Sequence, residues 1–183
     1  MDREGAHRSA VEKQAMLFGG AVVLGVFALD QLSKLAITRH LRLGEAIEII
    51  PHLLSLRHVE NPAFAFRTLA KLDAELLVAP LILVPMILTI ALVALLRNRR
   101  VGPALLLPGA LILGGASSNL ADRIARGVVI DFLQYHSGAR RVSVYNLADL
   151  AIFAGMLVLA LLFAQALLRA SPAAGRKQSE PSL

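Results

Sequence analysis

Long apolar runs alternate with shorter polar segments along this chain. Four runs each approach the roughly 20 apolar residues that a helix needs to cross a bilayer. They cover residues 16–37, 76–96, 101–121 and 145–168. The two middle runs carry no charge, and their prolines, which would break helices in water, are tolerated in membrane helices. The pattern predicts four transmembrane helices.

The segment between the first two runs has a different character. Residues 47–58, IEIIPHLLSLRH, mix β-branched residues and leucines around a proline, which favours short strands or an extended sheet on the membrane surface. This segment either anchors the two helices or forms a cradle that holds a peptide over the bilayer. We therefore predict an all-α membrane protein with four transmembrane helices and a small extended or β segment between helices 1 and 2.

The apolar region is expected to form a single integral membrane domain, residues 1–169, followed by a small, polar and disordered tail, residues 170–183. Basic residues precede the first run as in a signal peptide, but no A-x-A-like cleavage site follows it, which favours an uncleaved first helix. The run GGASS at residues 114–118 suits close packing between helices. The basic loop RNRR at residues 97–100 favours cytoplasmic termini, because short loops dominate the positive-inside rule.

Composition supports the membrane class. The 183 residues are 56% hydrophobic with a mean hydropathy of +0.64, which is too apolar for an ordinary soluble domain. The absence of cysteine excludes disulfides, thiolate catalysis and cysteine-ligated metals. The net charge of +6 is scattered, which argues against nucleic-acid binding. The histidines lack metal-ligand spacing, so we expect no metal and no organic cofactor.

Topology gathers the unusual polar residues at one end of the helices. In a four-span chain, spans 1 and 3 end on the side where spans 2 and 4 begin. The residues expected there are Asp30, Lys34, Asn61, Asn119, Asp122, Arg123, Asp131, Asn146 and Asp149. Carboxylates at membrane depth are costly and mark functional sites. Their clustering predicts proton chemistry on a substrate that lies in the membrane.

The acids can be ranked by their neighbours. Asp122 precedes Arg123, whose guanidinium would keep that carboxylate ionised and suited to orienting other groups. Asp131 has no adjacent base, so desolvation can raise its pKa, whereas Asp149 begins an apolar helix, whose N-terminus favours an anion. One protonated and one ionised carboxylate separate the acid from the base. This favours the pair Asp131 and Asp149 over the alternative pair Asp122 and Asp149.

Five segments together resemble the lipoprotein signal peptidases, the signal peptidase II family of bacterial aspartyl membrane proteases. They are DQLSK at 30–34, NPAFAF at 61–66, GGASSNLADR at 114–123, VVIDF at 128–132 and YNLADLAI at 145–152. The resemblance implies a catalytic pair formed by Asp131 and Asp149. It implies an enzyme of the bacterial inner membrane that releases signal peptides from diacylglyceryl-modified prolipoproteins, cutting on the N-terminal side of the lipidated cysteine.

The same resemblance implies the surroundings of the enzyme. Its partners would be lipid-modified prolipoprotein signal peptides, membrane lipids and inhibitors of the globomycin type. Separately, we expect a monomer, and cytoplasmic termini in a four-span chain make the site face outward. Four positions depart from the family pattern, namely Ala63, Phe64, Ser118 and Leu150. A bulky Phe64 could reshape the substrate groove, so these departures affect substrate range more than chemistry.

The other polar residues receive supporting roles. Asp30 and Lys34 have the i, i+4 spacing of a helical ion pair. Asn119 and Asn146 each stand three residues before an aspartate and could hydrogen-bond on the same helix face. Asn61 either bonds a substrate backbone or makes a turn before a proline.

Three rival functions remain open on the sequence. A proton-linked carrier would spread its acids through the bilayer depth rather than cluster them at one end. A non-catalytic paralogue would keep the fold and lack activity. A Ser–Lys protease would use Ser117 or Ser118 with Lys34, but those serines lie in the small-residue run, which packing alone explains.

Overall fold

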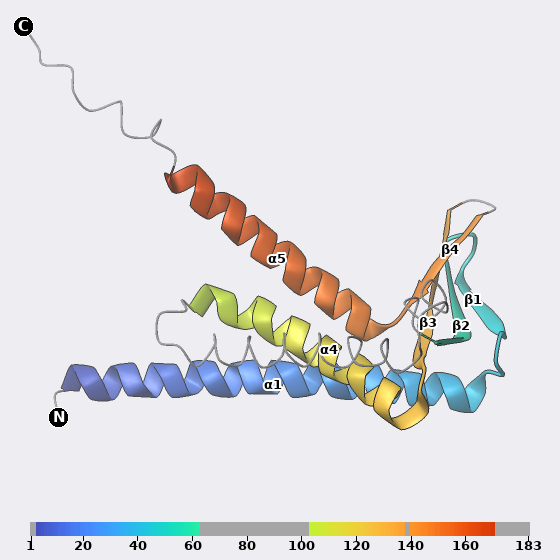
Figure 1. Cartoon of the computed structure of the whole chain (residues 1–183), viewed down its shortest axis with the longest axis horizontal. Helices are drawn as coiled ribbons and strands as arrows, with labels where there is room; N and C mark the ends of the chain where they lie inside the picture. The colour runs from blue at the N-terminus through green and yellow to red at the C-terminus, as the bar shows by residue number, and fades with distance from the viewer. Residues whose placement is uncertain (1–2, 63–102, 138–139, 171–183) are drawn as a thin grey trace, which may run out of the picture.

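The computed structural model describes residues 3–62, 103–137 and 140–170. These residues form three long helices and one sheet (Figure 1). The helices are α1 (Arg3–His40), α4 (Leu106–Arg126, preceded by the short 3-10 helix η1 at Pro103–Leu105) and α5 (Leu147–Ala170). The strands are β1 (Ala46–Ile50), β2 (Leu54–Asn61), β3 (Val129–Ser137) and β4 (Arg140–Tyr145).

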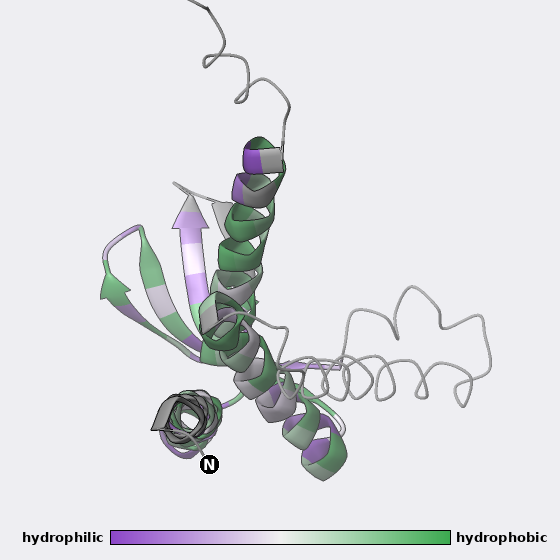
Figure 2. Ribbon diagram, turned by 90° about the vertical axis from the view of Figure 1, so that its left-hand side faces the viewer, coloured by the Kyte–Doolittle hydropathy of each residue, from purple (hydrophilic) through white to green (hydrophobic). Residues whose placement is uncertain are grey.

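The first, third and fourth predicted spans fall on these three helices. Two of the described helical segments, Lys13–His40 and Leu147–Arg169, are long and apolar enough to cross a membrane by length and composition. Figure 2 shows α5 as hydrophobic along most of its length, and its outer side chains, such as Phe153, Leu161 and Phe163, are more than half exposed. Such a surface suits contact with lipid chains. The second predicted span, residues 76–96, lies outside the described residues, as do residues 171–183 of the predicted tail.

Helix α4 packs between α1 and α5 through its small residues. A Cβ atom on Gly114 would lie 2.8 Å from the Cβ of Val26 and 2.9 Å from the carbonyl oxygen of Val23, both on α1. A Cβ on Gly115 would run into the carbonyl oxygen of Ala148 on α5. Only glycine lets the three backbones approach this closely, so the predicted packing role of this run is confirmed at these two positions.

The sheet corrects part of the sequence prediction. Its four strands are antiparallel in the order β1-β2-β3-β4, so the segment before α5 is paired with the segment after α1. The sequence predicted extended structure only between helices 1 and 2, and the all-α class was therefore incomplete. Strands β3 and β4 were not predicted from the sequence, and their pairing is irregular, with a break in register between Gln134 and His136.

A small apolar core fixes the sheet to the C-terminal end of α1. Ile37 and Leu41 of α1 pack with Ile130 and Phe132 of β3, and all four are at most 7% exposed. Removing the Phe132 side chain from such a core would cost about 3–5 kcal/mol. Alternate residues of a strand point to opposite faces, so burying Ile130 and Phe132 against α1 turns Asp131 toward the other face of the sheet.

Candidate active site

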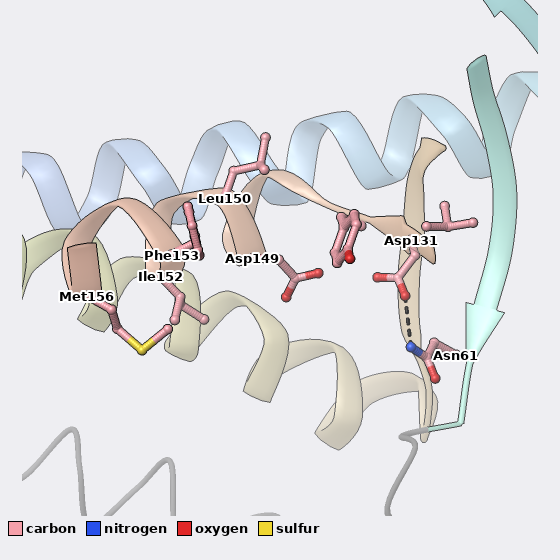
Figure 3. Close-up of a pocket in the computed structure, with 9 residues that line it drawn as sticks. Asn61, Asp131, Asp149, Leu150, Ile152, Phe153 and Met156 are labelled. Atoms are coloured by element: carbon pink, nitrogen blue, oxygen red, sulfur yellow. Dashed lines mark hydrogen bonds between the residues drawn. The ribbon is translucent and has the colours of Figure 1, made fainter. Parts of the chain in front are cut away.

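Asp131 and Asp149 reach one open pocket from different elements. Asp131 lies on β3 and Asp149 lies in the first turn of α5, and both line a cavity of about 680 Å³ (Figure 3). The wall that continues along α5 is apolar and consists of Leu150, Ile152, Phe153 and Met156. The pocket therefore joins a pair of carboxylates to a surface that can take an apolar ligand.

The start of α5 positions Asp149. Asn146 precedes the helix, and its Oδ1 accepts a 2.9 Å hydrogen bond from the backbone N–H of Asp149. In return, Oδ2 of Asp149 accepts a 3.2 Å hydrogen bond from the backbone N–H of Asn146. This is a reciprocal capping box, with aspartate in the place more often taken by glutamate. The Asn-x-x-Asp spacing thus fixes the carboxylate against the end of the sheet.

Three asparagine amides hold the two carboxylates. The Nδ2 of Asn146 donates to Oδ1 of Asp131 at 2.7 Å, and the Nδ2 of Asn61 donates to its Oδ2 at 2.9 Å. The Nδ2 of Asn119 donates to Oδ1 of Asp149 at 2.9 Å. Every carboxylate oxygen of the pair therefore has a donor. This network fixes both side chains while leaving them in contact with the pocket.

The environment of Asp131 makes this carboxyl group a weaker acid than an exposed aspartate. Burial raises the pKa of Asp131 to about 6. The charge of Asp149 adds to the rise, whereas the hydrogen bonds from Asn61 and Asn146 and the charge of Lys34 oppose it. A carboxyl group whose pKa is raised in this way is suited to act as the acid of such a pair.

A buried ion cluster lies behind the pair, where α1 crosses α4. The Nζ of Lys34 lies 2.6 Å from Oδ2 of Asp30 and 2.7 Å from Oδ2 of Asp122, and all three side chains are fully buried. The guanidinium of Arg126 forms a second ion pair with Asp122. Ser118 donates to Oδ2 of Asp30 at 2.7 Å, which gives that carboxylate a further partner. The cluster satisfies charges that would otherwise be costly to bury.

Comparison with known proteins identifies the family. The family model described as "Signal peptidase (SPase) II" matches residues 22–165. The lipoprotein signal peptidase of Moorella thermoacetica is 39% identical over 138 residues, which are 75% of this chain and 87% of that protein. The lipoprotein signal peptidase of Syntrophus aciditrophicus is 37% identical over 137 residues, which are 73% of this chain and 84% of that protein.

The chain belongs to the signal peptidase II family. Two solved structures, both described as a bacterial membrane enzyme, share its fold. One has a TM-score of 0.71 at 23% identity and covers 84% of this chain and 94% of its own. The other has a TM-score of 0.68 at 23% identity and covers 90% of this chain and 94% of its own.

Several supporting residues lie where the sequence predicted, and others have different partners. The i, i+4 ion pair between Asp30 and Lys34 is present. Asn146 bonds Asp149 within the same helical turn, as expected. Asn119 instead bonds across to α5, since its amide donates to Asp149 rather than to the aspartate three residues further along α4.

The expected pairing of Asp122 with Arg123 is wrong. Adjacent residues on a helix point about 100° apart, so they do not face a common partner. Asp122 pairs with Lys34 and Arg126, while Arg123 donates through Nη1 to the carbonyl oxygen of Asn119 at 3.2 Å. The nearest cation in the sequence was therefore not the nearest in space.

Asn61 and Ser118 also depart from their expected roles. The amide of Asn61 donates a hydrogen bond to Asp131, which is neither of the two roles expected from the sequence, a turn or a bond to the substrate backbone (Figure 3). Ser118 is fully buried and donates to Asp30, which argues against its use as a nucleophile with Lys34. Ala63 and Phe64, whose bulk was expected to shape a groove, lie outside the described residues.

Sequence reasoning missed two residues of this site. Gln31 donates through Nε2 to Oδ1 of Asp122 at 3.1 Å and to Oγ of Ser118 at 3.0 Å. Its position directly after Asp30 in a polar stretch of an apolar run was the available signal. Tyr145 lines the pocket from the end of β4 and had been counted only as the start of the last span.

Proposed function

We propose that this chain is a membrane aspartyl endopeptidase that removes signal peptides from diacylglyceryl-modified prolipoproteins. The cut would fall on the N-terminal side of the lipidated cysteine. The observation that carries the proposal is the pair Asp131 and Asp149, which line one open pocket with an apolar wall. Membership of the signal peptidase II family and the lipoprotein signal peptidases among its relatives support the same substrate.

The two carboxylates divide the proton transfers of peptide hydrolysis. A water held between them attacks the scissile carbonyl carbon while Asp149 takes its proton. Asp131, in its protonated form, donates to the carbonyl oxygen, which yields a neutral tetrahedral diol. Asp149 then gives its proton to the leaving nitrogen, Asp131 recovers a proton from one hydroxyl, and the carbon–nitrogen bond breaks. Both carboxyls return to their starting states, and no covalent enzyme intermediate forms.

Substrate binding favours the required state of Asp131. Its pKa of about 6 leaves a minor protonated fraction at neutral pH in the empty pocket. An apolar substrate that covers the pocket excludes water, and desolvation favours the neutral form of a carboxyl group further. The asparagine donors keep the side chain oriented in either state.

The apolar wall gives the lipid a place beside the site. Leu150, Phe153 and Met156 are about half exposed or more, and they continue from Asp149 along α5. A lipidated cysteine entering laterally between helices would lay its acyl chains on such a surface. The scissile bond would then lie at the level of the sheet, next to the carboxylates.

The proposed topology has four transmembrane helices in one integral membrane domain, residues 1–169, acting as a monomer in the bacterial inner membrane. The site faces outward and both termini are cytoplasmic. The course of the helices supports one part of this arrangement, the position of both ends on the side away from the site, because α1 runs toward the sheet and α5 runs away from it (Figure 1). The start of α1 and the end of α5 thus lie away from the catalytic end.

The decisive experiment is a gel-shift assay with the purified full-length protein and a diacylglyceryl-modified prolipoprotein. The wild-type chain should release the signal peptide, whereas Asp131→Asn and Asp149→Asn should not, although both should purify folded. Glu48→Gln, a matched acid-to-amide change on exposed β1, should keep activity. Cleavage that survives in both aspartate variants would defeat the proposal.

The same assay decides between the two candidate pairs. Asp122 belongs to the buried ion cluster, so Asp122→Asn should lower the melting temperature. The fraction of this variant that stays folded should still cleave the substrate. A folded Asp122→Asn that is inactive, together with an active Asp131→Asn, would instead identify Asp122 and Asp149 as the pair.

A further inference from the structure

Tyr145 is the last residue of β4 and stands directly before the asparagine that caps α5. Its side chain is 43% exposed and lines the same pocket as Asp131 and Asp149. The mechanism proposed above gives it no role. An exposed phenol beside two catalytic carboxylates therefore requires an explanation of its own.

The register of the sheet places Tyr145 next to Asp131. Tyr145 pairs with Leu133 of β3, and Leu133 lies two residues beyond Asp131 on the same face of that strand. Tyr145 is thus a diagonal cross-strand neighbour of Asp131, within reach of an aromatic side chain. Asn61 occupies the corresponding diagonal on β2, where it pairs with Val129, and its amide does reach Asp131.

The polar groups of the pocket differ in what they can donate. Among the described lining residues, the polar side chains are those of Asn61, Asp131, Tyr145 and Asp149. Asn61 already donates to Asp131, and the two acids are occupied with proton transfer. No hydrogen bond joins the Tyr145 hydroxyl to another described residue, so of these four groups it is the donor that the described residues leave for a ligand.

We propose that the Tyr145 hydroxyl donates a hydrogen bond to the scissile carbonyl oxygen of the substrate. This inference rests on the proposed function. Negative charge develops on that oxygen as water attacks, before the proton of Asp131 has fully arrived. A neutral donor aimed at this position stabilises the transition state more than the ground state. Tyrosine keeps its proton throughout, so the transfers between water, Asp149, Asp131 and the leaving nitrogen are unchanged.

The test compares the two tyrosines of the chain. Tyr145→Phe removes one oxygen atom and keeps the ring. Tyr135→Phe makes the same change at a phenol that is 47% exposed on β3 and is absent from the described lining of the pocket. Both full-length variants are assayed for kcat and KM on a diacylglyceryl-modified prolipoprotein, with melting temperature and the pH dependence of kcat measured alongside.

Tyr145→Phe should lower kcat by roughly ten- to hundredfold, at or below the range for loss of one oxyanion donor. KM, melting temperature and the pH at which activity declines should stay as in the wild type, and Tyr135→Phe should match the wild type throughout. A shifted pH profile would mean that the hydroxyl acts on Asp131 and would overturn the substrate contact.

Two other results would also overturn the inference. Wild-type kcat in Tyr145→Phe would do so while leaving the proposed function intact, because the wild-type chain would still cleave. A loss of kcat that parallels a loss of melting temperature would assign the hydroxyl a structural role. If the wild-type chain cleaves no diacylglyceryl-modified prolipoprotein, the proposed function and this inference both fail.

Discussion

Lys34 and Asn119 connect the buried ion cluster to Asp149 of the proposed catalytic pair. The Nζ of Lys34 donates to Oδ1 of Asn119 at 2.8 Å, and the amide of Asn119 donates to Oδ1 of Asp149 at 2.9 Å. The lysine thereby fixes which way the asparagine amide points, since its oxygen must face the ammonium. The charges buried between α1 and α4 thus orient a donor to a carboxylate on α5.

The first prediction concerns Lys34→Met. This variant leaves Asp30 and Asp122 buried without their shared ammonium, and breaking a buried pair in this way costs about 3–5 kcal/mol. We expect a large fall in melting temperature in detergent, together with lost activity. Lys13→Met, an exposed change on the same helix, should melt as the wild type does.

A double variant separates charge from packing. Asp122 keeps its ion pair with Arg126 in Lys34→Met, whereas Asp30 loses its ammonium partner. Adding Asp30→Asn removes that buried charge, so the double variant should melt at a higher temperature than the single one. Equal melting of the two would show that the lost packing of the lysine stem, rather than its charge, sets the cost.

The second prediction concerns pH. If Asp131 must be protonated to donate, kcat/KM should fall as the pH rises through about 6, the pKa of that carboxyl in the folded chain. The hydrogen bond from Asn61 lowers this pKa, so Asn61→Ala should raise it and move the decline to higher pH. The measurement is a pH profile of kcat/KM for both proteins. A decline that stays in place or moves to lower pH would contradict the role of Asp131 as the acid.

The pH dependence of folding stability should also report the raised pKa of Asp131. The folded chain binds a proton at Asp131 more tightly than the unfolded chain, whose carboxyl has its ordinary pKa near 4. The resulting stabilisation is complete below pH 4 and is lost as the pH rises through about 6. Asp131→Asn should remove this part of the pH dependence of melting.

The third prediction concerns the contact between α4 and α5. Gly115→Ala would press a methyl group against the carbonyl of Ala148, next to Asp149, and within 2.9 Å of Cγ1 of Ile152. Overpacking of this kind typically costs about 1–3 kcal/mol. We expect a lower melting temperature and a lower kcat, because the displaced helix carries Asp149 of the proposed catalytic pair. Gly25→Ala is the control, since a Cβ there would meet no atom of the described residues within 4 Å.

The sequence predicted the acids of the candidate site but not most of their partners. Asp131 and Asp149 stood out because they are acids in apolar surroundings, and the Asn-x-x-Asp spacing before α5 is a local capping pattern. The partners of Asn119, Asn61 and Asp122 depend on contacts between elements far apart in the chain. No local pattern specifies which of several nearby cations or acids a buried side chain will meet.

Strands β3 and β4 were not predicted for a related reason. Strands gain stability from pairing with partners rather than from their own propensity. Strand β3 also contains two buried polar residues, Asp131 and Gln134. They obscure the alternation of apolar and polar residues that would predict a strand. Asp131, the residue that suggested the function, therefore also interrupts the apolar pattern by which β3 could have been predicted.

The fourth prediction concerns inhibitors. Chelators, thiol reagents and serine-directed inhibitors should leave cleavage intact, because the proposed steps use only two carboxyls and water. A peptide antibiotic of the globomycin type should block cleavage in competition with substrate, by occupying the pocket between Asp131 and the apolar wall. Activity lost with a chelator and restored by zinc would contradict the aspartyl mechanism.

The last prediction concerns orientation in the membrane. The chain has no cysteine, so single cysteines can be labelled without background. Glu48 is exposed on β1, and Glu48→Cys should react with a membrane-impermeant thiol reagent in intact cells once the outer barrier is permeable to it. Ser179→Cys, in the C-terminal segment, should react only after the inner membrane is opened. Ser55 is a poor probe, because its side chain is buried and bonded to His136.

The reverse labelling pattern would place Asp131 and Asp149 on the cytoplasmic side. The sheet would then lie on the wrong side for an exported prolipoprotein, and the peptidase function would fail even with every catalytic contact in place.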